Sequence, residues 1–473
     1  MHVLKAIFVM LEVVILFNVL IFVHELGHFL AARWRGLQID RFAIWFGKPI
    51  WKTKIGGVEY ALGSIPAGGY VSLPQMAPME MIEGKVDPEV KQLPPISPLD
   101  KIIVAFAGPL FSFGLALCFA IVVFFVGRPV TENETSTTVG YVEKDGPADK
   151  AGLQRGDKIL TVDGHPVKKF GGMGDSVVWR VVSSTENTIP VEIERQGQSM
   201  KLQITPIIEE TKAWQRKALR QILIDSAQSS VVGRIYRNSP AAVAGLKVGD
   251  EVVDVNGMKP IHYSQVAELL DKNGTKPVDL TVLRDGQTLK FNVQPEIPVK
   301  PADEKKPKLG IEWVFGGKTK LAYPQPFEQV RSSVVQMLST FGALFDRKSH
   351  VKVQQLGGAI KILSIYYLLF QQEHGWRMAL WFSVLMNVNL AVLNMLPFPV
   401  LDGGHITLAF VEAIRRRPVS VRILNFVQTG CAVALIGFML YIAFFDVQDL
   451  MGKRGPEPEF APKAAMSSPG SNN

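Results

Sequence analysis

The sequence contains only two cysteines, Cys118 and Cys431, and both lie inside apolar stretches. This scarcity excludes a disulfide framework and a cysteine-rich metal site. The net charge of +8 is modest for 473 residues. It is not gathered into a basic face interleaved with aromatic residues, so we expect no nucleic-acid partner. The first apolar stretch lacks the basic start and small-residue cleavage site of a secretory signal, and we expect it to be retained as a membrane span.

Apolar residues are abundant, at 47% of the chain, which is typical of a membrane protein that carries soluble modules. Four stretches reach the roughly 20 residues that a helix needs to cross a bilayer. They are 4–30, 102–126, 378–396 and 422–445. A fifth stretch, 356–370, is shorter and contains Lys361, so we predict that it lies at the membrane interface.

The distribution of lysine and arginine predicts the direction of these spans, because cytoplasmic loops are enriched in both residues. The segment 33–101 contains nine of them and the loop 397–422 contains four. We therefore expect both segments to face the cytoplasm. Both chain ends and the large region 127–375 should then lie on the outer side of the membrane.

Residues His24, Glu25 and His28 form the motif HExxH near the end of the first span. On a helix, residues four apart share a face, so both imidazoles can approach one metal ion while Glu25 points at its water. Ionisable side chains inside a membrane helix cost roughly 2.5–3.5 kcal/mol each, so three together favour a shared function. The alternative is an ordinary surface helix, which the apolar surroundings disfavour. The motif predicts zinc-assisted hydrolysis.

Asp402 follows the third predicted span directly. The first and third spans run in the same direction, so their late residues should reach the same depth. We expect Asp402 to join His24 and His28 as the third zinc ligand, since two histidines, one carboxylate and a water form an open catalytic site. The alternative is that Asp402 is the N-cap of a helix that begins at Gly403.

The cytoplasmic segment 57–71 is too apolar for a free loop, and we predict a β-hairpin that dips toward the metal. An edge strand there could pair with an extended substrate, and we expect Gly68 and Gly69 to contact that peptide. A buried structural hairpin is the alternative. Asn389 and Asn394 could bond substrate or a neighbouring helix. We assign Ser112 no catalytic role.

The outer region contains a repeat with an offset of 93 residues. The pattern Pro-Ala-x-x-Ala-Gly-Leu-x-x-Gly-Asp begins at Pro147 in repeat 1, which spans 137–208, and at Pro240 in repeat 2, which spans 229–297. This pattern resembles PDZ domains, which bind extended peptides at a sheet edge. The sequence leaves two roles open for the repeats: they could bind peptides, or they could sterically restrict access to the metal site.

Apolar residues recur at helical spacing from Phe327 onward and predict an amphipathic helix. It could lie on the outer membrane surface or pack against repeat 2, and we favour the surface.

These motifs in combination resemble the bacterial site-2 protease family, closest to its RseP-type members with tandem PDZ domains. The matching segments are HELGH, AGPLFSF, the two repeats and NVNLAVLNMLPFPVLDGGH. The resemblance implies a polytopic α-helical membrane protein with four transmembrane helices, a membrane-associated β-hairpin and two β-rich PDZ-like domains. It also implies zinc ligation by His24, His28 and Asp402, acid–base catalysis by Glu25, and substrate contacts from Asn389 and Asn394.

By the same resemblance, the protein is an intramembrane zinc metalloprotease of the bacterial inner membrane. It would cleave membrane segments of single-span proteins, such as anti-sigma factors or remnant signal peptides. A zinc-stabilised scaffold that binds partners through the PDZ-like repeats is the main alternative, and a metal transporter is a weaker one. We expect six regions: a first membrane half at 1–126, PDZ-like domain 1 at 137–208, PDZ-like domain 2 at 229–297, an interfacial helical region at 320–375, a second membrane half at 376–446 and a flexible tail at 447–473.

Overall fold

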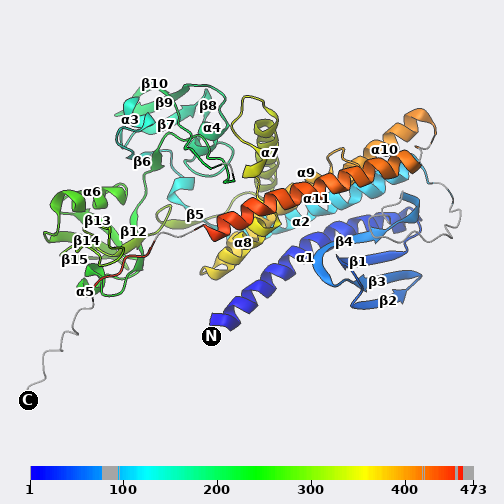
Figure 1. Cartoon of the computed structure of the whole chain (residues 1–473), viewed down its shortest axis with the longest axis horizontal. Helices are drawn as coiled ribbons and strands as arrows, with labels where there is room; N and C mark the ends of the chain where they lie inside the picture. The colour runs from blue at the N-terminus through cyan, green and yellow to red at the C-terminus, as the bar shows by residue number, and fades with distance from the viewer. Residues whose placement is uncertain are drawn as a thin grey trace, which may run out of the picture. The chain divides into compact units, whose positions relative to one another are not determined.

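The computed structural model describes residues 2–76, 94, 96–212, 214–417, 419, 421–452 and 456–461. The chain divides into two compact units (Figure 1). The membrane unit contains Met1–Arg128, Ala322–Gly342 and Val353–Leu450, and the repeat unit contains Pro129–Leu321, Ala343–Lys352 and Met451–Asn473.

Long apolar helices build the membrane unit. Helix α2 is the central one, since α1, α9 and α10 all pack against it (Figure 1). It begins where Ser97 caps the backbone N–H of Asp100, and it ends at Gly127. The helices are α1 (His2–Trp34), α2 (Pro98–Val126), α7 (Pro326–Phe345), α8 (Ala359–Gln371), α9 (Gly375–Asn394), α10 (Asp402–Arg415) and α11 (Val421–Met451).

Within the described residues, five segments are long and apolar enough to cross a membrane, one more than predicted. Four of them overlap the predicted spans, with bounds that differ by a few residues. The additional segment, Val353–Gln371, contains α8, for which we predicted an interfacial position.

A four-stranded sheet occupies the place of the predicted hairpin. Its strands are β1 (Arg41–Phe46), β2 (Trp51–Ile55), β3 (Val58–Leu62) and β4 (Ile65–Ser72), in the order β2-β3-β1-β4. The prediction of a hairpin within 57–71 is wrong, because β1 lies between β3 and β4. The true hairpin is β2–β3, which turns at Gly56 and Gly57, both with positive φ. Strand β4 is an edge strand that packs against α1 (Figure 1).

The amphipathic helix from Phe327 is present as α7, and its valines pack within the membrane unit instead of on repeat 2; its position on the outer membrane surface stays a prediction. Its apolar residues Val330 and Val334 pack in one cluster with Ala116 and Ala120 of α2 and with three valines of α9. The side chain of Gln329 also donates a hydrogen bond to the Ala120 carbonyl, at 2.9 Å. The small alanines leave a groove that the α7 valines fill, so α7 is a component of the membrane unit.

The two repeats have equivalent strands that are paired differently: repeat 1 has the order β10-β9-β7-β8 with a separate pair β11-β6, whereas repeat 2 forms one sheet in the order β15-β14-β13-β12-β16. In repeat 1, β11 (Ile224–Ser226) pairs with β6, and in repeat 2, β16 (Ile311–Trp313) pairs with β12. Both added strands come from outside the predicted ranges. They pair in equivalent register, Ile224 with Val142 and Ile311 with Ile235.

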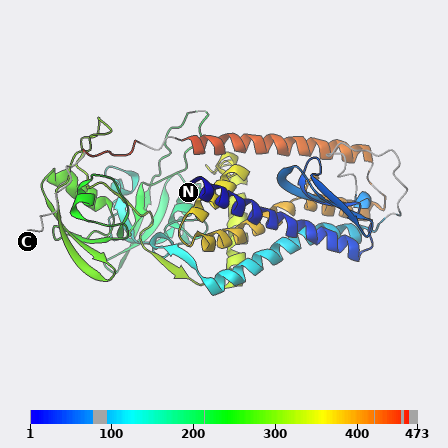
Figure 2. The same ribbon diagram turned by 90° about the horizontal axis from the view of Figure 1, so that it is seen from below.

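The other strands of repeat 1 are β6 (Val139–Val142), β7 (Lys158–Val162), β8 (His165–Pro166), β9 (Ile189–Arg195) and β10 (Gln198–Ile204), with helices α3 (Pro147–Lys150) and α4 (Val177–Ser183). Repeat 2 contains β12 (Ser230–Ile235), β13 (Glu251–Val255), β14 (Val278–Arg284) and β15 (Gln287–Val293), with α5 (Pro240–Ala244) and α6 (Ser264–Asn273). A short pair, β5 (Arg128–Thr131) and β17 (Thr319–Ala322), completes the described strands. Each repeat has its own apolar core, and Figure 2 shows the strands from a second direction.

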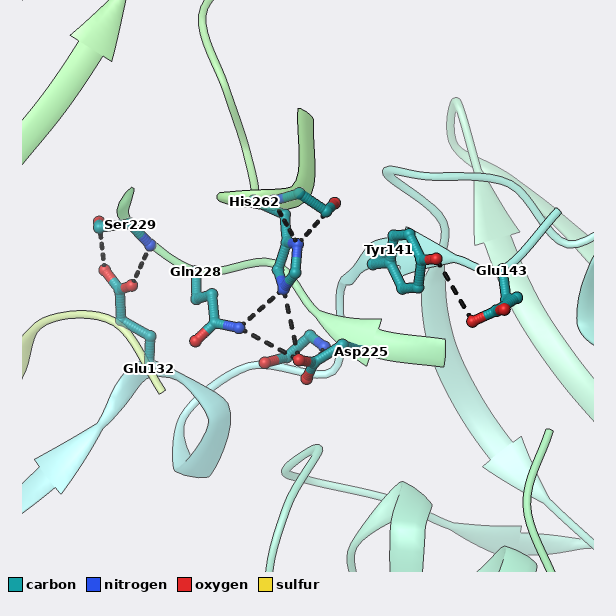
Figure 3. Close-up of polar contacts among 9 residues, drawn as sticks. Glu132, Tyr141, Glu143, Asp225, Gln228, Ser229 and His262 are labelled. Atoms are coloured by element: carbon teal, nitrogen blue, oxygen red, sulfur yellow. Dashed lines mark hydrogen bonds and ion pairs between the residues drawn. The ribbon is translucent and has the colours of Figure 1, made fainter. Parts of the chain in front are cut away.

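Polar contacts connect the two repeats (Figure 3). His262 of repeat 2 is buried, and its Nε2 lies 3.3 Å from the Asp225 carboxylate on β11. The ring of Tyr141 on β6 stacks on the same imidazole, with centroids 5.8 Å apart. A salt bridge between Arg155 and Glu268 adds a second connection. The repeats therefore share an interface within their unit.

The prediction of a flexible tail over 447–473 is wrong for two parts of it. Residues up to Met451 continue α11, and residues 456–461 pack against repeat 2. Phe460 of this segment is only 5% exposed. Residues 462–473 lie outside the described part of the chain.

Candidate metal centre

Three side chains from two distant segments meet inside the membrane unit. His24 and His28 lie on one face of α1, four residues apart, as the helical period requires. The Nε2 atoms of the two imidazoles are 3.3 Å apart. The Asp402 carboxylate, at the start of α10, places Oδ2 at 3.2 Å from His24 Nε2 and Oδ1 at 3.4 Å from His28 Nε2. Both histidines are buried.

The spacing of these atoms fits a tetrahedral zinc ion. Ligand bonds of about 2.0–2.1 Å in a tetrahedron separate neighbouring ligand atoms by about 3.3 Å. The three separations in this cluster are 3.2, 3.3 and 3.4 Å, with Asp402 contributing Oδ2 toward His24 and Oδ1 toward His28. One Asp402 oxygen, Oδ2, is also buried and has no hydrogen-bond partner among the described residues. Three ligands at this spacing leave the fourth tetrahedral position open, as catalytic zinc sites do.

The outer ring nitrogens of both histidines are held by α2. His28 Nδ1 lies 2.8 Å from the Val104 carbonyl, which can only accept, so this nitrogen donates and Nε2 keeps its lone pair. His24 Nδ1 lies 3.0 Å from Ser112 Oγ. Such partners fix the tautomer and the orientation of a metal-binding imidazole. His28 Nε2 is thereby available for a cation, and His24 Nε2 is available in the tautomer whose Nδ1 donates to Ser112 Oγ.

A glycine on α2 makes room for this arrangement. A Cβ atom at Gly108 would lie 2.2 Å from His28 Nε2, which is far inside van der Waals contact. A Cβ at Gly27 would likewise meet the Ala107 carbonyl at 2.4 Å. Helices α1 and α2 can therefore approach closely only because both positions are glycine.

Glu25 lies between the two histidines in sequence and next to the edge strand β4. A Cβ built at Gly69 would be 3.2 Å from Glu25 Cγ. Gly68, which we also predicted to contact the substrate, has φ +73°, and a side chain there would collide with the Phe46 ring. The sheet edge and the carboxylate of HExxH thus share one side of the site.

The two predicted asparagines differ in position. The Asn394 side chain lies 3.3 Å from His24 Nε2, so it borders the cluster. Asn389 comes five residues earlier on α9, an offset that turns it to another face of the helix. Its buried Oδ1 has no hydrogen-bond partner among the described residues. Only Asn394 is brought to the histidines.

Sequence reasoning missed the contributions of α2. From the sequence we assigned Ser112 no catalytic role, and no sequence pattern links Ser112 or Gly108 to the histidines. Asp402 does not act as the cap considered for it, since the cap position of α10 is Leu401. The useful signal was the polar Ser112 within an apolar span, because a buried hydroxyl needs a partner.

Comparison with known proteins identifies the family. The chain is 30% identical over 92% of its length to a Neisseria meningitidis protein named "Putative zinc metalloprotease", of which it covers 97%. It is 28% identical to the regulator of sigma-E protease RseP of Escherichia coli, covering 92% of this chain and 98% of that protein. It is 26% identical to RseP of Salmonella typhimurium, covering 91% and 97%. Residues 12–438 match the description of peptidase family M50, and the chain belongs to this family.

Proposed function

We propose that this chain is an intramembrane zinc metalloprotease that cleaves the membrane segments of other proteins. The observation that carries the proposal is the tetrahedral spacing of His24, His28 and Asp402 within apolar helices. Relatives named regulator of sigma-E protease support a role in sigma-E regulation. The expected substrates are single-span membrane proteins such as anti-sigma factors, with remnant signal peptides as a second class.

His24, His28 and Asp402 would hold the zinc ion, which when bound lowers the pKa of a water molecule to about 7 and polarises a carbonyl group. Glu25 follows His24 directly and can reach the same water. It would take a proton from the water during attack on the peptide carbonyl. It would then return this proton to the leaving amine, so one carboxylate serves as base and as acid.

A helical substrate must first unwind, because its carbonyl groups are engaged in its own hydrogen bonds. The edge strand β4 lies beside Glu25, so an extended peptide that adds to this edge of the sheet would reach the site. Gly69 keeps this approach free of side chains, and Asn394 borders the metal cluster. We assign substrate contacts to Gly68, Gly69 and Asn394, with Asn389 as a weaker candidate.

The docked tail supports four spans. The chain leaves repeat 2, passes through three candidate segments, Val353–Gln371, Gly375–Asn394 and Phe426–Met451, and returns to repeat 2. An even number of them must therefore cross the membrane. Interfacial placement of α8 satisfies this condition. The PDZ-like repeats would then lie on the outer side of the bacterial inner membrane, where they bind peptides or restrict access.

The proposal is tested by incubating the detergent-purified protein with a tagged single-span peptide, with and without a chelator. We expect cleavage that stops with chelator and resumes after zinc is added. The Glu25→Gln variant should lose about 10²- to 10⁴-fold in rate, the usual contribution of a general acid–base, and should keep its zinc. Metal content is measured by mass spectrometry.

The matched control is Glu12→Gln, which removes the other carboxylate of α1. This variant should cleave at the normal rate. A zinc-stabilised scaffold predicts that Glu25→Gln changes nothing. Cleavage that persists in chelator and in Glu25→Gln would refute the protease assignment.

A further inference from the structure

The segment 456–461 lies in an extended conformation against repeat 2 (Figure 1). The Val299 N–H donates to the Glu459 carbonyl at 2.8 Å, and the Glu459 N–H donates to the Lys300 carbonyl at 3.0 Å. Lys300 and Glu459 form an antiparallel bridge. The tail thus adds a short strand to the linker that follows β15.

Charged side chains on the repeat match the acidic side chains of the tail. Arg234 of β12 donates two hydrogen bonds to the Glu457 carboxylate, at 2.7 and 2.9 Å. This two-pronged geometry is selective for a planar carboxylate. The ring of Tyr236 lies 5.0 Å from the same guanidinium and helps to orient it. Lys300 Nζ lies 2.9 Å from Glu459.

Phe460 is the apolar anchor of the segment, with 5% of its surface exposed. Its ring lies against Gly310, the residue before β16. A Cβ at Gly310 would be 2.8 Å from Phe460 Cε2 and 2.2 Å from Ser239 Cβ, and this glycine has φ +74°. Any other residue at position 310 would clash with both Phe460 and Ser239, so the binding of the aromatic ring depends on glycine.

The sequence prepares the segment for this contact. Pro456 and Pro458 have fixed φ values, and a residue that precedes a proline, such as Glu457, favours extended backbone. An extended peptide therefore loses less conformational freedom on docking than a flexible one. Alternating acidic residues and one aromatic then supply the contacts.

We propose that Glu457-Pro458-Glu459-Phe460 is a built-in ligand of repeat 2, and that Arg234, Lys300 and Gly310 form its binding site. The chain leaves repeat 2 after β16 and returns to it after α11, so the docked tail closes a loop that contains helices α7 to α11. An external peptide of the same chemistry must displace the tail to bind. The proposal is independent of the metal centre.

Hydrogen exchange of the full-length protein in detergent tests this inference. The amides in 296–301 and 456–461 should exchange slowly in the unaltered chain. Phe460→Ala should speed amide exchange in both segments by about 10- to 100-fold, the factor that burial of one phenylalanine contributes. Arg234→Glu should do the same, and Arg234→Glu with Glu457→Arg should restore protection.

The control for the aromatic is Phe315→Ala, since Phe315 is 73% exposed in the same unit. The control for the charge is Arg237→Glu, three residues after Arg234 and exposed. Neither should affect the tail. Protection of β13 and β14 reports that repeat 2 is folded in every variant. Free exchange of 456–461 in the unaltered chain, or unchanged exchange of 296–301 after deletion of 456–473, would overturn the proposal.

Discussion

Asp157 in repeat 1 and Asp250 in repeat 2 are buried carboxylates, and each accepts two hydrogen bonds from one arginine, Arg195 or Arg284. Asp402 in the membrane unit is also largely buried, but its ion-pair partners among the described residues are the two imidazoles of HExxH. The repeats therefore carry complete arginine–carboxylate ion pairs, whereas the membrane cluster brings one carboxylate together with two imidazoles.

This difference separates structural charge from functional charge. A buried carboxylate needs a compensating cation. In the repeats the chain supplies that cation itself, so the aspartates hold the fold together and do no chemistry. At Asp402 the described residues supply two imidazoles and no lysine or arginine ion-pair partner, and a metal ion would complete the site.

The largest expected effect comes from removing Asp402, the proposed third ligand. Asp402→Asn should lose zinc and reduce substrate cleavage by at least about 100-fold, since changes outside the ligand shell alone cost 10- to 100-fold. Asp250→Asn should keep both zinc and cleavage. Metal content and peptide cleavage are measured on the same preparations. Equal zinc content in the two variants would remove the contrast between the carboxylates.

The second effect is on stability. Asp250→Ala leaves Arg284 without its partner and should lower the free energy of unfolding of repeat 2 by about 3 kcal/mol, the low end for a broken buried pair. Glu192→Ala, which breaks an exposed pair with Lys201, should lower the free energy of unfolding far less, because solvent screens surface ion pairs. Amide exchange in β13 and β14 for the first variant, and in β9 for the second, measures these values. Similar costs would show that burial of the pair is unimportant.

A third test sharpens the comparison within the membrane unit. Gly108→Ala pushes a methyl group into the His28 ring, and zinc affinity should fall by about 10- to 100-fold, as for other disturbed supports of metal ligands. Gly114→Ala changes the same helix where a Cβ meets no atom within 4 Å, so zinc affinity should be unchanged. Zinc titration against a competing chelator distinguishes the two. A loss in both would point to a general effect on α2.

The smallest effect concerns pH. Burial raises the pKa of Asp250, but hydrogen bonds from Arg284 and the Lys247 amide outweigh it and hold this pKa below the ordinary 3.8. The pair therefore stabilises repeat 2 fully above the unfolded pKa, and this contribution is lost as pH falls through the folded pKa. Amide exchange of repeat 2 between about pH 5 and pH 2.5 should show the loss, and Asp250→Asn should reduce it. If amide exchange in the Asp250→Asn variant depends on pH as strongly as in the unaltered chain, Asp250 is not the group responsible for the loss.

Short-range patterns were predictable from the sequence. The face shared by His24 and His28 follows from the helical period, and the two repeats follow from matched turns and an offset of 93 residues. Contacts between distant segments were not predictable in this way. Strand β1 enters between β3 and β4, and α7 fills a groove on α2, because pairing and packing depend on which surfaces meet.

The sequence by itself determined the residue types of the site, the apolar spans and the duplicated outer region, because each is encoded in local spacing. Only the tertiary structure decided that Asp402 meets the histidines at ligand spacing, that Gly108 and Ser112 support them, and that Phe460 returns to repeat 2. The physical reason is that such contacts arise from close packing of side chains far apart in the chain, and local periodicity carries no information about them.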